Sequence, residues 1–275
     1  MRNPWNYTTT TFYSTVLLLL AFPLLLPAQT AQPIFVKQHT TYQNDIPKSL
    51  QRKFRRDAAR LALRLEAEKE DLRYLNISIP QPTIEMVYGL LTNVYSHDDM
   101  AKSIAKCNVH TFPNPSIDQL VLIYEKDIDW AAPLRDGISE TESALINDLL
   151  DEYELVIEKH VPWNDTQDAL TIRSKAPLNM AALANEFTDI DGVAEIDLGV
   201  PKVSGNDIVL NRVQDGWELL YVMKFGSFSN GKGKKHIWKY HVLDSGSINF
   251  IEESGSPIPS WMRCEVEETL LVFRG

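Results

Sequence analysis

Three side chains of the types that carry out acid–base catalysis lie near the ends of expected strands in the middle of the chain. They are His110, Asp129 and His160. Histidine titrates near neutral pH and a carboxylate can orient its ring, so such a group can move protons to and from a substrate. We predict a hydrolytic acid–base site if the sheet brings these residues together. Ordinary polar residues at strand ends are the alternative.

The motifs that identify common catalytic sites do not occur in the sequence. It contains no G-x-S-x-G elbow, no H-E-x-x-H zinc motif, no Walker loop and no dinucleotide-binding glycine pattern. His236 and His241 lie on one expected strand at a spacing that points them to opposite faces, so they do not share a metal ion unless the strand bulges. We therefore expect no cofactor and no metal site, and we favour a role without catalysis.

Two basic segments are candidates for binding an anionic partner. One is a helical face with four candidate residues, Arg52, Arg55, Arg56 and Arg60. The other is a glycine-rich loop with three, Lys232, Lys234 and Lys235. Each segment can dock onto acid, either the acidic middle of this chain or an anionic surface. The alternatives are an ordinary hairpin loop and a solvated helix face with pairs such as Arg64 with Glu68.

The charge of the chain is unevenly distributed. Its formal net charge is −10, and residues 117–200 contain five basic and nineteen acidic side chains, whereas residues 47–73 contain nine basic and five acidic. A protein that binds nucleic acid in general needs a basic surface to neutralise phosphates. The composition therefore excludes nucleic acid as a general partner, and the central region is expected to repel polyanions.

The beginning of the chain has the pattern of an export signal. Arg2 is the only charged residue before Lys37, and residues 16–28 read VLLLLAFPLLLPA. A membrane-spanning helix needs about twenty apolar residues, and Pro23 would kink such a helix. We predict a signal peptide that is cleaved after Ala28, leaving a secreted or periplasmic protein without a membrane span. An uncleaved anchor is the alternative.

Two cysteines, Cys107 and Cys264, are present in the chain. The oxidising compartment that an exported protein reaches allows them to form a disulfide. Two buried thiols are the alternative, because the spacing of two cysteines does not show whether they meet.

The pattern of apolar residues predicts an α+β fold in five regions: a signal peptide (1–28), a tether (29–45), a helical region (46–116), a central module (117–200) and an antiparallel β region (201–275). Helices are expected at 46–73, 83–94 and 96–106. In the central module, strands at 120–124, 154–160, 169–174 and 193–198 alternate with two helices, one after the capping box 139–142 and one capped by Asn179. This β-α-β-β-α-β order is that of a ferredoxin-like module. The last region should contain strands at 217–225, 236–243 and 248–251 and within 266–273.

Two resemblances follow from these patterns. The helix 179–190 and the following Asp191-Gly192-Val193-Ala194-Glu195-Ile196 are similar to the last helix and strand of the propeptide-like inhibitor module of subtilisin-type proteases. That resemblance implies a ferredoxin-like fold and an inhibitor role, although no protease domain follows. The carboxy-terminal hairpin resembles that of uncharacterised exported bacterial proteins, which imply no activity. Their hairpin loop carries a cysteine pair, which Ser227-Phe228-Ser229-Asn230-Gly231 lacks.

These observations together predict an exported α+β protein that binds or interacts without catalysis. The partner is not identified by the sequence, and a protein or a cell-envelope component fits. A hydrolase with a His/Asp acid–base site and a protease-inhibitor-like module remain as alternatives.

Overall fold

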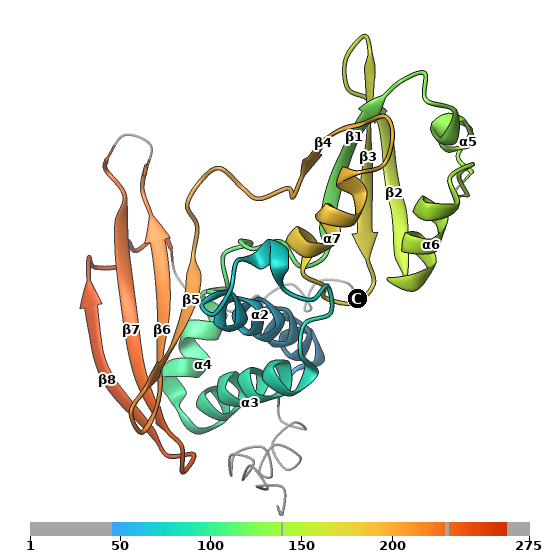
Figure 1. Ribbon diagram of the computed structural model, residues 1–275. Coiled ribbons are helices and arrows are strands. Elements are labelled where there is room, and N and C mark those ends of the chain that lie inside the picture. Colours follow the sequence, from blue (N-terminus) through green and yellow to red (C-terminus); the bar gives the residue numbers. More distant parts are fainter. Residues whose placement is uncertain (1–45, 139, 229–230, 263–275) are drawn as a thin grey trace, which may run out of the picture. The chain divides into compact units, whose positions relative to one another are not determined.

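The computed structural model describes residues 46–262 except 139, 229 and 230 (Figure 1). The predicted signal peptide, the tether and the expected strand within 266–273 lie outside the described residues. The described chain folds into α-helices and two antiparallel sheets, which confirms the α+β class. None of the helices in this part of the chain combines the length and the apolar character needed to cross a bilayer.

Three helices form the amino-terminal part of the described chain: α2 (Lys48–Ala67), α3 (Gln81–His97) and α4 (Asp99–Lys106). The predicted first helix was too long, because α2 ends at Ala67 and a short 3-10 turn, η2 (Leu72–Tyr74), follows. Asp71 caps that turn by accepting a hydrogen bond from the Arg73 backbone N–H. The Asp98 side chain likewise accepts from Ala101 N at 2.7 Å and starts α4.

The first sheet contains β1 (Gln119–Glu125), β2 (Leu155–Pro162), β3 (Gln167–Ser174) and β4 (Val193–Asp197) in the order β2-β3-β1-β4. All neighbouring strands are antiparallel. Between β1 and β2 lie η3 (Asp129–Ala131), α5 (Ala132–Arg135) and α6 (Ala144–Glu152), and α7 (Met180–Thr188) joins β3 to β4. Leu122 of β1 and Leu170 of β3 pair in register and share a core with Leu149 of α6 and Phe187 of α7. The helices therefore cover this face of the sheet.

The two helix starts predicted in this module differ in outcome. Asn179 caps α7, as expected, by accepting a hydrogen bond from Ala182 N at 3.3 Å. The capping box at 139–142 does not start α6, because the cap is Ser143, which accepts from Ile146 N at 3.4 Å. Several serine and threonine residues precede this helix, and only the one directly before the first turn can reach its free N–H groups.

The second sheet contains β5 (Asp207–Val213), β6 (Gly216–Phe225), β7 (Lys234–Leu243) and β8 (Ile248–Gly255), antiparallel and in that order. The strand predicted at 236–243 is β7, and it buries four alternating side chains: His236, Trp238, Tyr240 and Val242. The strand β5 was not predicted, and only Ile208 and Leu210 are buried in it. The predicted last residue of β8 was too early, since pairing with β7 continues to Gly255.

The buried side chains form two cores. One combines the inner faces of α2, α3 and α4 with that of β5–β8, and it includes Phe54, Leu61, Leu91, Tyr221 and Tyr240. The other lies between the β1–β4 sheet and its helices. The helical region and the carboxy-terminal sheet are distant in sequence but are buried against each other.

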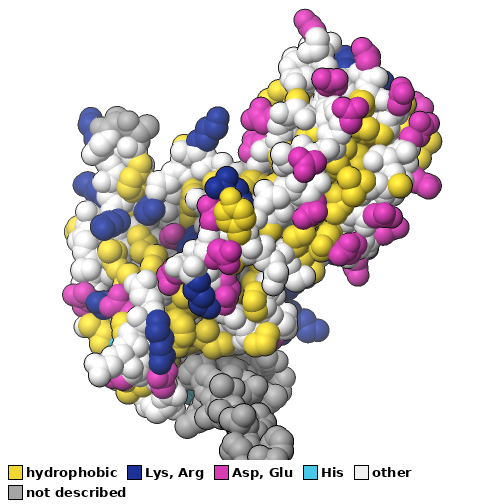
Figure 2. All heavy atoms as spheres, in the orientation of Figure 1, with side chains coloured by type: hydrophobic (Ala, Val, Ile, Leu, Met, Phe, Trp, Pro, Cys, Tyr) yellow, Lys and Arg dark blue, Asp and Glu magenta, His cyan; other side chains and the backbone are white. Residues whose placement is uncertain are grey.

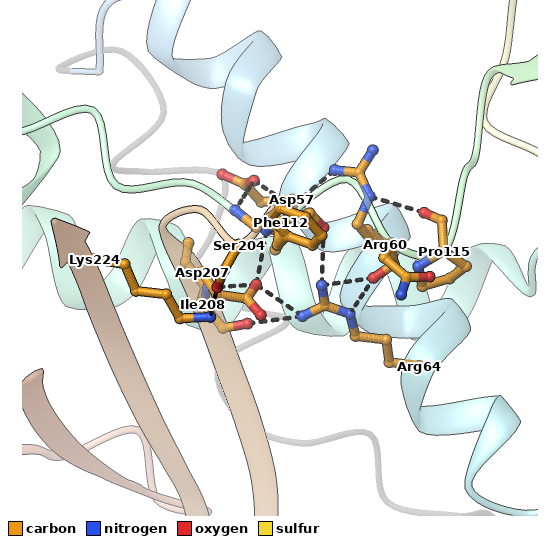
Figure 3. Close-up of polar contacts among 11 residues, drawn as sticks. Asp57, Arg60, Arg64, Phe112, Pro115, Ser204, Asp207, Ile208 and Lys224 are labelled. Atoms are coloured by element: carbon orange, nitrogen blue, oxygen red, sulfur yellow. Dashed lines mark hydrogen bonds and ion pairs between the residues drawn. The ribbon is translucent and has the colours of Figure 1, made fainter. Parts of the chain in front are cut away.

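Arg64 of α2 connects these distant segments through polar contacts (Figure 3). Its Nη1 donates to Asp207 Oδ1 and to Ile208 O, both at 3.0 Å. Its Nη2 donates to Phe112 O at 2.9 Å and to Asn114 O at 2.7 Å, and Nε donates to Asn114 O at 3.0 Å. All three guanidinium nitrogens of Arg64 therefore donate to the 112–114 loop or to β5. The alternative interpretation, a solvated helix face on which Arg64 pairs with Glu68, does not describe this residue.

We predict that Arg64→Met lowers the free energy of unfolding by about 3 kcal/mol, because it leaves several carbonyl oxygens and Asp207 without their charged donor. Arg64→Lys should lose less, since it keeps the charge but not the planar fork. Urea denaturation of both variants measures these losses. Equal stability of the Met variant and the wild type would contradict the assigned role.

Candidate functional site

Helix α2 places four polar side chains on one side, because Lys53, Asp57, Arg60 and Arg64 are spaced three or four residues apart. The loop that follows α4 packs against this side. Between helix and loop lies a cavity of about 340 Å³, here called the α2 cavity. Its lining residues are Lys53, Arg56, Asp57, Arg60, Asn108, His110, Thr111 and Pro113.

The turn after α4 positions the loop side of the α2 cavity. Asn108 has a φ of 54°, in the left-handed region that asparagine tolerates better than most residues and that commonly ends a helix. Lys53 Nζ donates to Asn108 Oδ1 at 2.6 Å and holds this turn against α2. The chain then continues along α2 with His110 and Thr111 facing Asp57.

Asp57 is buried and holds His110 in one orientation. Its Oδ2 lies 2.7 Å from His110 Nδ1, and its Oδ1 accepts from Thr111 N at 2.8 Å and from Thr111 Oγ1 at 2.7 Å. An ionised carboxylate can only accept, so Nδ1 carries the proton. His110 Nε2 is buried and has no hydrogen-bond partner within the described part of the chain. It is therefore left to accept from a ligand, or to donate to one when the ring is protonated.

Arg60 brings a buried positive charge to the α2 cavity. Only 4 % of the residue is exposed, and its Nε donates to Pro115 O at 3.0 Å while Nη1 donates to Thr111 Oγ1 at 2.8 Å (Figure 3). Burial, and then repulsion by Arg56, lower the pKa of Arg60. Arginine stays charged at neutral pH despite such a shift. Its positive charge is thus held by neutral oxygens in a poorly hydrated place.

The four predicted arginines do not share one environment. Arg56 and Arg60 line the α2 cavity, and Arg56 also pairs with Asp118 at 2.6 Å. Arg55 instead pairs with Glu85 at 3.2 Å and lies over the Tyr88 ring. Arg52 is exposed on the same helix and is not among the lining residues. The predicted lysines, Lys232, Lys234 and Lys235, are exposed at the β6–β7 hairpin instead.

The three predicted acid–base residues each have a different setting. His110 contacts Asp57, whereas His160 of β2 lies 3.2 Å from Asp168 of β3. Asp129 is the first residue of η3. Among the residues that the structure describes, no hydrogen bond or ion pair joins any two of His110, Asp129 and His160.

The carboxylates that contact these histidines, Asp57 and Asp168, were not predicted from the sequence. Asp168 is almost fully buried, and Arg135 Nε lies 3.4 Å from its Oδ2. One signal for it exists in the sequence, because Asp168 occupies the inward phase of the alternation that continues through Leu170 and Ile172. Burial, followed by the nearby charge of Asp168, raises the pKa of Tyr124 to about 12.

This shift predicts a loss of stability at high pH. Tyr124 binds its proton more tightly when folded than at its ordinary pKa of 10.0. The difference stabilises the fold fully below the ordinary pKa, and it disappears as the pH rises toward the folded pKa. Tyr124→Phe should therefore lose less stability than the wild type across this window in urea denaturation. If the stability of Tyr124→Phe and of the wild type fell equally with rising pH, the raised pKa of Tyr124 would be contradicted.

The structure also bears on metal and disulfide chemistry. In the described ranges, no group of three His, Cys, Asp or Glu side chains is arranged to hold a metal ion. Cys107 follows α4, and its Sγ lies 3.5 Å from Ser103 O. Cys264 lies outside the described residues, so its pairing with Cys107 stays a prediction.

Comparison with known proteins finds no matching family model, no matching curated protein and no matching solved structure. Function is therefore inferred from the residues of this chain.

Proposed function

We propose that this chain is an exported, non-enzymatic binding protein whose α2 cavity holds an anionic group of its ligand. The observation that carries this proposal is the charge of the cavity wall. Lys53, Arg56 and Arg60 face a space whose one lining carboxylate, Asp57, is already engaged by His110 and Thr111. The export part of the proposal is supported by the signal-like pattern of residues 1–28.

The chemistry of the lining favours a phosphate or carboxylate group. A guanidinium presents donors that match the oxygens of either anion. Arg56 is exposed and pairs with Asp118 through Nη2, and its other N–H groups remain for a ligand. An anion close to Arg60 would offset the charge that burial and Arg56 make unfavourable. His110 Nε2 adds a further donor when the ring is protonated. A cavity of about 340 Å³ is large enough for such a group.

We predict that inorganic phosphate binds to the full chain and that Arg56→Gln weakens this binding about tenfold, the effect of losing one charge-assisted hydrogen bond. Isothermal titration calorimetry measures the affinity. Arg52→Gln is the matched control, because it removes the same charge from an exposed position of the same helix. It should bind within about twofold of the wild type.

Two results would contradict the anion site. One is the absence of a phosphate-dependent heat at millimolar concentration. The other is an equal loss in the Arg52→Gln variant, which would show that binding depends on the net charge of α2 and not on the cavity.

A hydrolase is the second candidate, and the Asp57–His110 contact favours it. A buried carboxylate that fixes the His110 tautomer leaves Nε2 able to take a proton from water. Among the described lining residues the one hydroxyl is that of Thr111, which donates to Asp57 and accepts from Arg60, so water is the expected nucleophile. The binding proposal predicts no release of nitrophenol from 4-nitrophenyl phosphate above the uncatalysed rate. Turnover that is lost in His110→Asn, with phosphate binding retained, would favour the hydrolase instead.

We infer that the 117–200 region is a ferredoxin-like module. The antiparallel order β2-β3-β1-β4, with α6 and α7 against one face, supports this inference. Its resemblance to protease inhibitor modules keeps inhibition of a subtilisin-type enzyme as a third candidate. Lack of inhibition by the full chain at high molar excess would remove that candidate.

A further inference from the structure

The end of the second sheet that carries the β6–β7 hairpin is strongly basic. Residues 219–243 contain five lysines and no aspartate or glutamate, although the whole chain has a net charge of −10. Lys224 of β6 is paired in register with Lys235 of β7, and Lys234 lies opposite Phe225. Figure 2 shows Lys and Arg side chains, in dark blue, around this hairpin. Lys234 and Lys235 are both exposed.

The linker that leads to β5 adds a further lysine, Lys202, to this end of the sheet. Lys224 Nζ donates to Ser204 Oγ at 2.9 Å (Figure 3), and Lys224 N donates to Asn206 Oδ1 at the same distance. These contacts hold the linker beside β6. The two residues before Ser204, Lys202 and Val203, are exposed.

Two apolar side chains accompany these lysines. Phe228 is 41 % exposed and Val203 is 73 % exposed. The Phe228 ring packs on Gly233 so closely that a Cβ added there would lie 2.4 Å from its Cδ1, so the glycine permits this packing. We call the group Lys202, Val203, Lys224, Phe228, Lys234 and Lys235 the lysine tip. Residues 229 and 230 are not part of it.

We propose that the lysine tip docks the protein on an anionic lipid bilayer. Within the described residues, the hairpin strands form ion pairs from Lys239 to Glu218, from His236 to Glu253 and from His241 to Asp215, and none involves Lys224, Lys234 or Lys235. Lysines that are not engaged in an ion pair are attracted to anionic headgroups, and each contributes separately. The acidic 117–200 region is repelled by the same surface, so the lysine tip and not that region is the part that binds it.

The apolar side chains distinguish a bilayer from a soluble polyanion. A soluble acidic polymer needs only the lysines, whereas Phe228 and Val203 gain by leaving water at the headgroup–acyl boundary. A basic cluster combined with a small apolar insertion is the combination that gives peripheral membrane binding. The lysine tip shares no residue with the α2 cavity, so the two proposals can fail independently.

Co-sedimentation with vesicles tests the lysine tip. We expect the chain without its predicted signal peptide to bind vesicles of phosphatidylcholine mixed with phosphatidylglycerol, and to bind pure phosphatidylcholine much less. The double variant Lys234→Gln/Lys235→Gln should lose about tenfold or more in partitioning, and Phe228→Ser should lose severalfold. The matched control is Lys48→Gln/Lys175→Gln, which removes the same charge from two exposed lysines outside the tip. All proteins in this test begin at Gln29, because the apolar segment 16–28 would itself bind both kinds of vesicle.

Several results would overturn this inference. Equal binding to both kinds of vesicle would exclude an electrostatic dock. An equal loss in the control would show that only net charge matters. Wild-type binding by Phe228→Ser, together with equally tight binding of soluble polyglutamate to the wild type, would assign the tip to an acidic polymer instead of a bilayer.

Discussion

A buried charged side chain is costly unless its polar atoms are hydrogen-bonded, and this cost organises much of the structure around α2. The helix carries Asp57 and Arg60 on its buried side and Arg64 at the edge of that side. Leaving such groups without partners would cost more than the marginal stability of a domain allows. Backbone atoms of the 111–115 loop and of β5 supply the partners. The same contacts that satisfy α2 therefore fix the path of the chain after α4.

The α2 cavity follows from this arrangement. The loop is held on one side by Arg64 and on the other by Asp57, and His110 and Thr111 lie on the stretch that leads into these contacts. Arg60 is then surrounded by neutral acceptors, while Arg56 remains partly exposed and pairs with Asp118. The basic residues of α2 therefore have two roles. Arg64 connects segments that are distant in sequence, whereas Arg56 and Arg60 place positive charge beside a cavity that a small anion can enter.

The main elements could be predicted because their signals are local. Apolar residues at helical spacing mark α2, α3 and α4, a regular alternation marks β7, and a less regular one marks β6. The strand β5 was missed because Asp207, Asn211 and Arg212 interrupt its alternation, and its position depends on pairing with β6. The end of α2 was placed too late because leucines continue at helical spacing beyond Ala67, whereas Asp71 caps a separate turn.

The candidate site was only partly predictable for the same reason. Its residue types are visible in the sequence, and Arg56, Arg60 and His110 were all selected. Their burial is not visible, because Arg60 and Arg52 occupy similar positions in a run of basic residues. What separates them is the 108–115 loop, about fifty positions away, which covers Arg60 and leaves Arg52 exposed. In the sequence, Asp57 does not differ from the other charged residues of that face, because its contacts with His110 and Thr111 depend on the fold.

The most direct test of this account is a crystal structure of the protein grown with tungstate, an electron-dense analogue of phosphate. The account predicts an anomalous peak in the α2 cavity, within hydrogen-bonding distance of Arg56 and His110. Anomalous peaks only at exposed lysines, with none in the cavity, would contradict it.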